Sequence, residues 1–279
     1  MNFLKDYIRL HIRFLFSLYR AFLLRLDKRA FSFFFNLKSL LLSSPARLNW
    51  DGKSFIIRDK EISGFKYKIR EQRVCNMAYE YGVKKRAQIL AECYFLNEIK
   101  FNDGDIFLDC GANVGDLKIW FDLNKININY VGFEPSPTEF GCLKENVHPA
   151  IVHNIGLWKE TGELEFFVSS QNGDSSFIEP VSFDERIKVP VGKLESYVSS
   201  NVKIIKLEAE GAEPEILEGL GDKLRLIEYI SADLGYERGI KCESTLVPVT
   251  NYLLERGFEL VNLSHGRICA LYKNKNFEV

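Results

Sequence analysis

The sequence predicts an α/β fold in which a mainly parallel sheet of seven strands carries helices on both faces and ends in an antiparallel hairpin. Two observations predict it. Short apolar runs alternate with segments of helical periodicity from residue 106 onward, which is the pattern of parallel strands joined by crossover helices. The last two apolar runs are separated by only a short turn, so these two strands must pair antiparallel.

The order of the elements follows from the pattern of apolar residues along the chain. Strands of the main sheet are expected at residues 106–110, 130–133, 151–155, 202–207, 226–231, 258–262 and 267–272. Helices are expected from residue 114, at 138–146, from residue 214 and at 244–256. A two-stranded excursion at residues 164–168 and 187–191 interrupts this alternation.

Upstream of the sheet the chain is expected to hold two further parts. At 279 residues it is longer than the roughly 250 residues of a large single α/β domain. Residues 1–46 are expected to form a basic amphipathic helical arm, 47–100 a hairpin or lid followed by a helix, and 101–279 the sheet domain. The Ser-Ser-Pro break at residues 43–45 is typical of a linker.

The charge of the chain is divided unevenly. Residues 1–47 hold nine Lys or Arg against Asp6 and Asp27, a balance of +7, and because the whole chain has a net charge of −1 the remainder carries −8. An acidic body argues against nucleic acid as its partner, whereas the basic arm suits an anionic surface.

The basic residues of the arm would lie on one stripe of a helix, because Lys5, Arg9 and Arg13 recur every four residues and Arg20 returns to nearly the same angle. Such a helix can lie in an anionic membrane interface, or it can pack its apolar face on the body or on a second subunit. No uncharged run approaches the roughly 20 residues of a spanning helix, and no signal-peptide pattern is present. We therefore expect a cytoplasmic protein whose residues 1–46 contact the inner face of the membrane or mediate self-association.

The six cysteines are expected to be reduced thiols in the core. They show neither a CxxC pair nor a Cys/His spacing that suits zinc. They are Cys75, Cys93, Cys110, Cys142, Cys242 and Cys269.

A cofactor loop is predicted in the segment FLDCGANVG, residues 107–115, where a strand of buried type runs into a turn with Gly111 and Gly115 before a helix. Glycine lets the backbone approach a ligand closely, and a helix start offers free N–H donors. The GxxxG spacing differs from the GxGxxG of dinucleotide-binding folds and disfavours that class. Asp109 and Asn113 add polar side chains to this loop. Asp109 can bind an ammonium group or order the loop, or it can serve only as a helix-capping or loop-bracing carboxylate.

Two further polar residues follow at the ends of the next strands. Glu134 closes the segment YVGFEP roughly 20 residues after the loop, where a carboxylate can accept hydrogen bonds from both hydroxyls of an adenosine ribose. Asn154 follows the third strand and is the candidate for contact with the adenine ring. His153 beside it is assigned no role.

Four motifs together resemble the FkbM family of methyltransferases, from about Gly104 to the carboxyl terminus. They are FLDCGANVG, VGFEP, IKLEAEGAEPEILEG and ADLGYERG…EST…NYLLERGFELV. The predicted strand order is similar to the Rossmann-like plan of class I methyltransferases. The resemblance implies S-adenosyl-L-methionine as cofactor and O-methylation of a sugar hydroxyl, in a glycan or its lipid-linked precursor, or of a secondary metabolite. The cofactor residues would be Asp109, Gly111, Asn113, Gly115, Glu134 and Asn154.

Catalytic candidates lie at the carboxyl end of the fourth strand, where open sheets place their ligands. An alcohol needs a proton acceptor, for which Glu210 is the first candidate and Glu208 the second. The family often has Asp at position 208, and the extra methylene of Glu shifts a carboxylate by about 1.5 Å, enough to matter for a positioned group. These glutamates and Glu213 could also bind a divalent cation, but without a His or a further Asp in the motif we predict no metal.

Other residues are ranked below these glutamates. Asp233, Glu237 and Arg238 follow the fifth strand and could line the acceptor pocket, His265 is a more distant alternative base, and residues 169–176 are typical of a loop that closes over an acceptor.

Two functions remain open after this. One is an O-methyltransferase acting on a small-molecule or glycan acceptor. The other is a catalytically weak protein that keeps the fold and binds another biosynthetic enzyme; the intact Gly111, Gly115 and Glu134 favour the enzyme.

Overall fold

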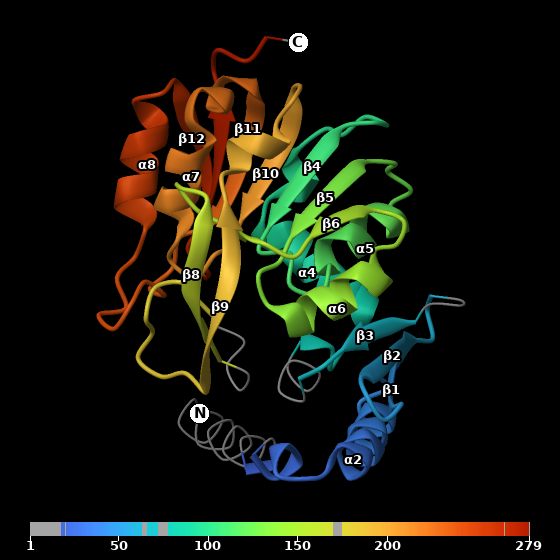
Figure 1. Cartoon of the computed structure of the whole chain (residues 1–279). Coiled ribbons are helices and arrows are strands. Elements are labelled where there is room, and N and C mark those ends of the chain that lie inside the picture. The colour runs from blue at the N-terminus through green and yellow to red at the C-terminus, as the bar shows by residue number, and fades with distance from the viewer. Residues whose placement is uncertain are drawn as a thin grey trace, which may run out of the picture. The chain divides into compact units, whose positions relative to one another are not determined.

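The chain forms two compact units, Met1–Lys85 and Arg86–Val279 (Figure 1). The computed structural model describes residues 18–19, 21–62, 66–71, 78–169, 175–264 and 266–278. The predicted basic stripe, from Lys5 to Arg20, and His265 therefore lie outside the described residues.

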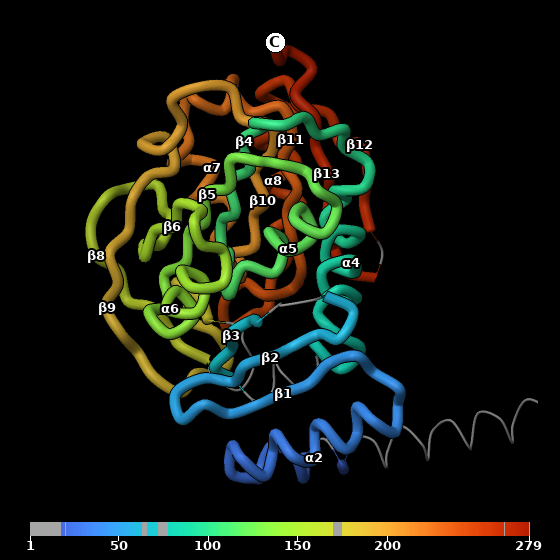
Figure 2. Tube along the Cα trace, turned by 90° about the vertical axis from the view of Figure 1, so that its right-hand side faces the viewer, coloured from blue at the N-terminus to red at the C-terminus, as the bar shows by residue number. Residues whose placement is uncertain are grey.

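In the first unit a helix packs on a small antiparallel sheet (Figure 2). The helix is α2 (Lys28–Leu41), and the sheet has the order β1 (Ala46–Trp50), β2 (Phe55–Asp59), β3 (Tyr67–Ile69). Asp27 caps α2 because its carboxylate accepts hydrogen bonds from the first free N–H groups, and Phe31 packs on Phe55 with ring centroids 5.4 Å apart. The expected hairpin is present, and β1 is an additional strand directly after the expected linker.

The second unit holds the seven-stranded sheet, which confirms the predicted class I methyltransferase plan. Its strand order is β12-β13-β11-β10-β4-β5-β6, with β13 antiparallel to both of its neighbours and the other pairs parallel. The strands are β4 (Ile106–Cys110), β5 (Asn129–Phe133), β6 (Ile151–His153), β10 (Val202–Leu207), β11 (Ile227–Asp233), β12 (Phe258–Leu263) and β13 (Cys269–Asn274).

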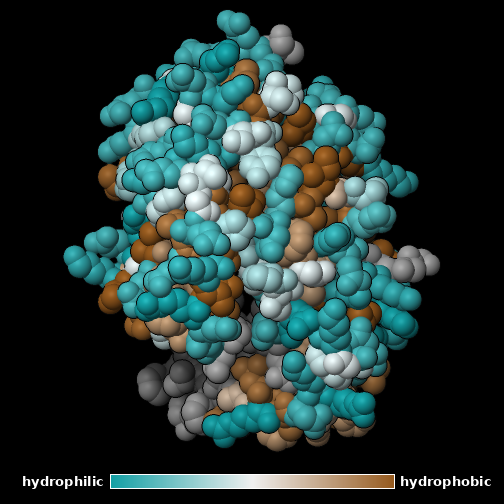
Figure 3. Space-filling view, viewed as in Figure 1, coloured by the Kyte–Doolittle hydropathy of each residue, from teal (hydrophilic) through white to brown (hydrophobic). Residues whose placement is uncertain are grey.

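Helices cover this sheet on both faces, as predicted (Figures 1 and 2). Successive residues of β4 point to opposite faces of the sheet. Phe107 packs on Phe121 of α5 (Asp116–Leu123), with ring centroids 5.0 Å apart. Leu108 joins the buried cluster that contains Leu217 of α7 (Glu213–Leu220) and Leu253 of α8 (Leu246–Leu254). The helices are α4 (Val83–Cys93), α5 (Asp116–Leu123), α6 (Pro137–Asn146), α7 (Glu213–Leu220) and α8 (Leu246–Leu254), with short 3-10 turns at Leu96–Glu98, Leu194–Tyr197 and Gly221–Leu226. Figure 3 shows a largely hydrophilic surface on this unit, with hydrophobic residues gathered over its middle.

A second sheet corrects the expected excursion. The predicted strand at residues 151–155 ends at His153, and the chain then forms β7 (Gly156–Leu157), which joins β8 (Gly162–Val168) and β9 (Glu185–Gly192) in the order β7-β9-β8. A Cβ atom at Gly156 would lie 2.1 Å from Phe177 Cζ, so glycine lets the chain cross from one sheet to the other without displacing the Phe177 ring.

The topology places the predicted site in one crevice. The chain runs from β4 through β5 and β6 to one side of the sheet and then crosses to β10 and β11 on the other side of β4. Ligands of open α/β sheets bind at such a switch point, beyond the carboxyl ends of the strands. The glycine loop after β4 and the LEAEG turn after β10 therefore lie side by side.

Candidate functional site

The glycine loop passes directly against the turn that follows β10. Gly111 and Gly115 have φ of +78° and +93°, and a Cβ atom at Gly111 would lie 1.8 Å from the carbonyl oxygen of Glu208. Asn113 also has a positive φ, +50°, a conformation that Asn tolerates better than most residues. The loop therefore needs glycine at position 111 to reach its place, and α5 begins immediately behind it.

Glu134 is held at the end of β5 by main-chain donors. Its Oε2 accepts a hydrogen bond from Asn113 N at 2.8 Å, and its Oε1 accepts one from Ser136 N at 2.9 Å. Burial, reinforced by the negative charge of Glu139, raises the pKa of Glu134 to about 8. Each carboxyl oxygen keeps a further lone pair, so the group can also accept hydrogen bonds from a ligand's hydroxyls.

Asn154 lies at the same corner of the crevice. Its Nδ2 donates hydrogen bonds to the carbonyl oxygens of Glu134 at 2.9 Å and Pro135 at 3.0 Å. The side chain thus fixes the backbone that carries Glu134. Contact between Asn154 and an adenine ring stays a prediction.

A row of alternating charges crosses the carboxyl ends of β4, β10 and β11 and the amino end of β13. Lys206 Nζ lies 3.1 Å from Asp109 Oδ1 and 3.0 Å from Glu208 Oε2. Arg267 pairs directly with both Glu208 and Asp233. We call these five residues the ion chain.

The ion chain is anchored to the strands and to the glycine loop. Lys206 and Asp109 are register partners on β10 and β4, and Tyr130 of β5 donates a hydrogen bond of 2.6 Å to the second oxygen of Asp109. Lys206 also donates to the carbonyl oxygen of Gly111 at 2.6 Å. The buried cation therefore holds the loop as well as the two carboxylates.

The ion chain keeps Glu208 ionised. Burial alone would raise the pKa of Glu208, but Lys206 and Arg267 hold it well below its usual range. Burial alone would lower the pKa of Lys206, but the carboxylates of Asp109 and Glu208 raise it above its usual value. A carboxylate that already binds two cations and has a lowered pKa is a weak proton acceptor, which leaves Glu208 the poorer of the two candidate bases.

Glu210 is placed differently from Glu208. It has φ of +49°, its carbonyl oxygen accepts a hydrogen bond from Ser176 Oγ at 2.9 Å, and its carboxyl group is hydrogen-bonded to that of Glu237. Burial and the negative charge of Asp233 raise the pKa of Glu237 to about 7. The Glu237 carboxyl group therefore titrates near neutral pH beside Glu210.

Glu213, Glu215 and Arg238 form hydrogen bonds and ion pairs around the same turn. Glu213 accepts hydrogen bonds from Ala209 N at 2.9 Å, Gly211 N at 3.2 Å and Thr245 Oγ1 at 2.9 Å. Arg238, which we expected to line the acceptor pocket, forms a two-pronged ion pair with Glu215 and donates to the carbonyl oxygen of Gly211. Together they hold the strained turn that presents Glu210.

Sequence reasoning missed the cations of this site. Lys206 lies in an apolar strand, and a lysine in such a strand rarely stays buried without a carboxylate partner, so it was a usable signal. Arg267 follows a turn and gave no comparable signal. Within the described residues, no group of three or more His, Cys, Asp and Glu side chains is arranged to hold a metal ion.

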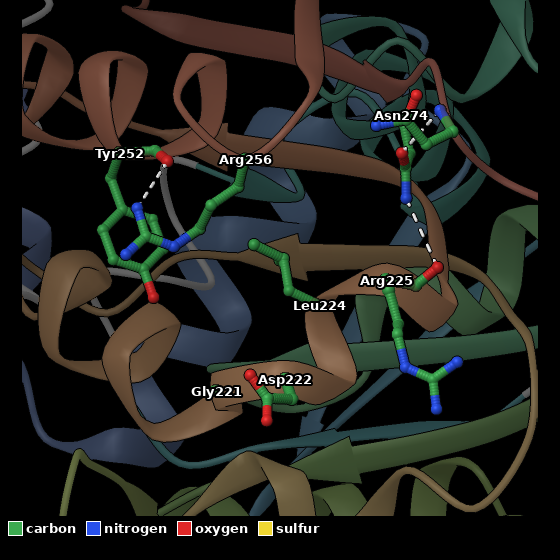
Figure 4. Close-up of a pocket in the computed structure, with 8 residues that line it drawn as sticks. Gly221, Asp222, Leu224, Arg225, Tyr252, Arg256 and Asn274 are labelled. Carbon is green, nitrogen blue, oxygen red and sulfur yellow. Dashed lines mark hydrogen bonds between the residues drawn. The ribbon is translucent and has the colours of Figure 1, made fainter.

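A separate pocket of about 550 Å³ lies where β11 begins and β13 ends, away from the carboxyl ends of the parallel strands (Figure 4). Its polar groups already bind one another: Arg256 stacks on the Tyr252 ring at 3.6 Å and donates to its carbonyl oxygen, while Asn274 donates to the carbonyl oxygens of Arg225 and Ile227. It shares no residue with the crevice, and we assign it no ligand.

Comparison with known proteins gives a family match and several more distant relatives. The methyltransferase FkbM domain matches residues 109–260, which is more than half of the chain. "Methyltransferase 1" of Beauveria bassiana is 24% identical over 178 residues, covering 53% of this chain and 71% of that protein. The hexuronic acid methyltransferase AglP of Haloferax volcanii is 26% identical over 145 residues, covering 47% of this chain and 56% of that protein. The 31-O-demethyl-FK506 methyltransferase FkbM of Streptomyces tacrolimicus is 30% identical over 63 residues, 23% of each chain.

Solved structures with a similar fold are far more distant in sequence. A SAM-dependent methyltransferase from Aquifex aeolicus has a TM-score of 0.40 at 12% identity, covering 68% of this chain and 97% of that chain. The N-terminal domain of human METTL16 in complex with SAH has a TM-score of 0.40 at 14% identity, covering 70% and 71%. The strand order, and not these scores, carries the fold assignment.

Proposed function

Because the chain belongs to the FkbM family of methyltransferases, we propose that it transfers the methyl group of S-adenosyl-L-methionine to a hydroxyl oxygen. The observation that carries the cofactor assignment is the joint geometry of Gly111 and Glu134. The loop approaches so closely that a side chain at position 111 would collide with the LEAEG turn, and a carboxyl group with free lone pairs faces it.

The charge of the crevice suits this cofactor. The carboxyl groups of Asp109, Glu208 and Asp233 outnumber the two cations, Lys206 and Arg267, that pair with them. S-adenosyl-L-methionine supplies, when bound, a methyl group on a positively charged sulfur, and it carries an ammonium group as well. An acidic crevice attracts such a cation and lowers its free energy when bound.

Glu134 would accept hydrogen bonds from the ribose hydroxyls of the cofactor. Asp109 is already engaged by Tyr130 and Lys206, so in this proposal it acts by fixing the loop and by its charge. Asn113, Gly115 and Asn154 complete the predicted cofactor set.

Glu210 is the proposed proton acceptor for the hydroxyl group. Its hydrogen-bond partner Glu237 has a pKa raised to about 7 by burial and by the charge of Asp233, so a group beside Glu210 can take up or release a proton near neutral pH. Glu208 is the second candidate, and its ion pairs suit it better to holding the turn than to accepting a proton.

The proposed acceptor class is a sugar hydroxyl, in a glycan or its lipid-linked precursor, or a secondary metabolite. The names of two relatives, a hexuronic acid methyltransferase and an FK506 methyltransferase, support this class. Acceptor identity is set by pocket shape and loops and does not follow from the fold.

Peripheral membrane contact is proposed for the first unit. The exposed face of α2 carries Phe33, Leu37, Leu40 and Leu41, whose exposed fractions run from 42% to 78%, with basic residues at the start of the helix. No helix among the described residues is long and apolar enough to cross a bilayer. Sedimentation with anionic liposomes tests this proposal: Leu37→Glu with Leu41→Glu should reduce binding, whereas Val247→Glu, equally exposed on α8, should not.

Calorimetry with S-adenosyl-L-methionine and its demethylated product tests the enzyme proposal. Binding of both is expected, followed by transfer of a labelled methyl group to a compound in extracts of the native host. Glu210→Gln should then slow transfer about 10²–10⁴-fold while cofactor affinity is unchanged. Folded protein that binds neither compound would instead support the alternative of a catalytically weak partner of another enzyme.

A further inference from the structure

Two thiols meet beside the ion chain. Cys93 is the last residue of α4 and Cys269 is the first residue of β13, and their sulfur atoms lie 3.3 Å apart although the residues are 176 positions apart in the chain. A disulfide bond has a length of about 2.05 Å, so the two sulfurs need to approach by only about 1.3 Å to form one.

The two thiols differ in exposure and acidity. Cys93 is partly exposed, whereas Cys269 is buried. A hydrogen bond from Cys269, helped by the positive charge of Arg267, lowers the pKa of Cys93 against the effect of burial. That same hydrogen bond and burial raise the pKa of Cys269. Because the thiolate is the reactive form of cysteine, the accessible member of the pair is also the nucleophilic one.

We propose that Cys93 and Cys269 form an oxidant-reactive pair that closes into a reversible disulfide, with hydrogen peroxide as the co-reactant. In the first step the Cys93 thiolate attacks one peroxide oxygen, the O–O bond breaks, and a sulfenic acid forms while hydroxide leaves and takes up a proton to become water. In the second step Cys269 loses its proton and attacks the Cys93 sulfur, and the S–O bond breaks as the oxygen leaves as a second water. Two thiols and one peroxide thus give one disulfide and two waters.

The other described cysteines do not have this arrangement. Cys110 and Cys142 are buried, and burial together with the charge of Asp109 raises the pKa of Cys110. Cys242 is exposed and serves as a matched control for a single accessible thiol. Cys75 lies outside the described residues.

The bond would form where helix and strand support the ion chain. Cys269 N donates to the carbonyl oxygen of Arg267 at 2.7 Å, and Cys269 is the register partner of Asp233. Tyr94, next to Cys93, lies under the Arg267 guanidinium with its ring centroid 5.7 Å away. A disulfide would therefore join the end of α4, directly before Tyr94, to the start of β13, two residues after Arg267.

The pair can be tested on the full chain without any assay of methyl transfer. Reduced protein is treated with hydrogen peroxide and its intact mass and peptide map are recorded. We expect a loss of about 2 Da, a peptide linked through Cys93 and Cys269, and full reversal by a thiol reductant. A variant with Cys75→Ser and Cys242→Ser should still form the bond, and Cys93→Ser should not.

Two results of the same experiment would contradict the proposal. Conversion of Cys93 to sulfinic acid while Cys269 can still be alkylated after unfolding would overturn the proposal, as would a disulfide between any other two cysteines. Should Cys269→Ser fail to fold, the partly exposed Cys93→Ser variant and the peptide map of the wild type decide the matter.

Discussion

The two sides of the crevice hold their polar groups by different means. On the β4–β5–β6 side, main-chain N–H groups bind the Glu134 carboxyl, and a glycine allows the close approach of the loop. On the β10–β11–β13 side, side chains hold one another through the ion chain. The first side depends on backbone shape and the second on charge balance, so the two should respond differently to substitution.

The largest effect is expected from Lys206→Met, which leaves the Asp109 and Glu208 carboxylates without their shared cation. The Lys206 and Asp109 side chains are 3% and 1% exposed, and removing one partner of such a buried pair lowers the free energy of unfolding by about 3–5 kcal/mol. Urea unfolding measures it. The control Lys193→Met breaks a pair whose side chains are 41% and 40% exposed, and should change stability by less than about 1 kcal/mol. Equal losses would mean that charge balance does not hold this side.

Gly111→Ala tests the backbone side. Gly104 also has a positive φ, +88°, but a Cβ atom there would meet nothing within 4 Å, so Gly104→Ala reports the cost of the conformation alone. The clash with the Glu208 carbonyl should make Gly111→Ala costlier by about 1–3 kcal/mol in the free energy of unfolding. A difference near zero between the two variants would remove the close approach from the explanation of the loop.

Glu134→Ala should weaken binding of S-adenosyl-L-methionine by about 1–3 kcal/mol, because the hydrogen bonds from the buried carboxyl group to the ribose hydroxyls are lost. Calorimetry measures the effect, with the exposed Glu163→Ala as control. Unchanged affinity would show that the ribose lies elsewhere in the crevice.

A further expected effect is a pH dependence of stability that differs between the two sides. Glu134 and Glu237 have ordinary pKa values near 4.5 and folded values of about 8 and about 7. Because folding raises both pKa values, each group's contribution to stability is complete below pH 4.5 and is lost as the pH rises through its folded pKa. As the pH rises, Glu134→Gln should lose less stability than the wild type, and the difference should grow up to about pH 8. For Glu237→Gln the same difference should stop growing at about pH 7. Urea unfolding between pH 5 and pH 9 measures both, and coincident curves would contradict the assignment.

The same contrast explains what the sequence could predict. Gly111, Gly115 and Glu134 lie in short continuous motifs, so the glycine loop and the carboxyl group beside it could be predicted from local pattern, while their roles toward a cofactor stay predictions. Arg267 and Glu208 are 59 positions apart, and their pairing depends on the β11–β13 register, which no local pattern specifies.

Local conflicts account for the elements that differed from expectation. The segment at residues 151–155 is apolar enough for one strand, but Gly156 must pass Phe177 and the chain leaves the main sheet there. The strand β1 was not predicted because it starts directly after Pro45, and proline more often marks a linker than the approach to a strand.

The hydrogen bond from Ser176 to the carbonyl oxygen of Glu210 bears on how proteins with this fold could come to act on different acceptors. Ser176 belongs to the segment between β8 and β9, an insertion between β6 and β10 that contributes no strand to the seven-stranded sheet. Exchange of this insertion would alter the surroundings of the Glu210–Glu237 pair while Glu134 and the glycine loop keep their own contacts. Under the proposed function, replacement of this one segment would change the surroundings of the acceptor and leave the proposed cofactor contacts in place.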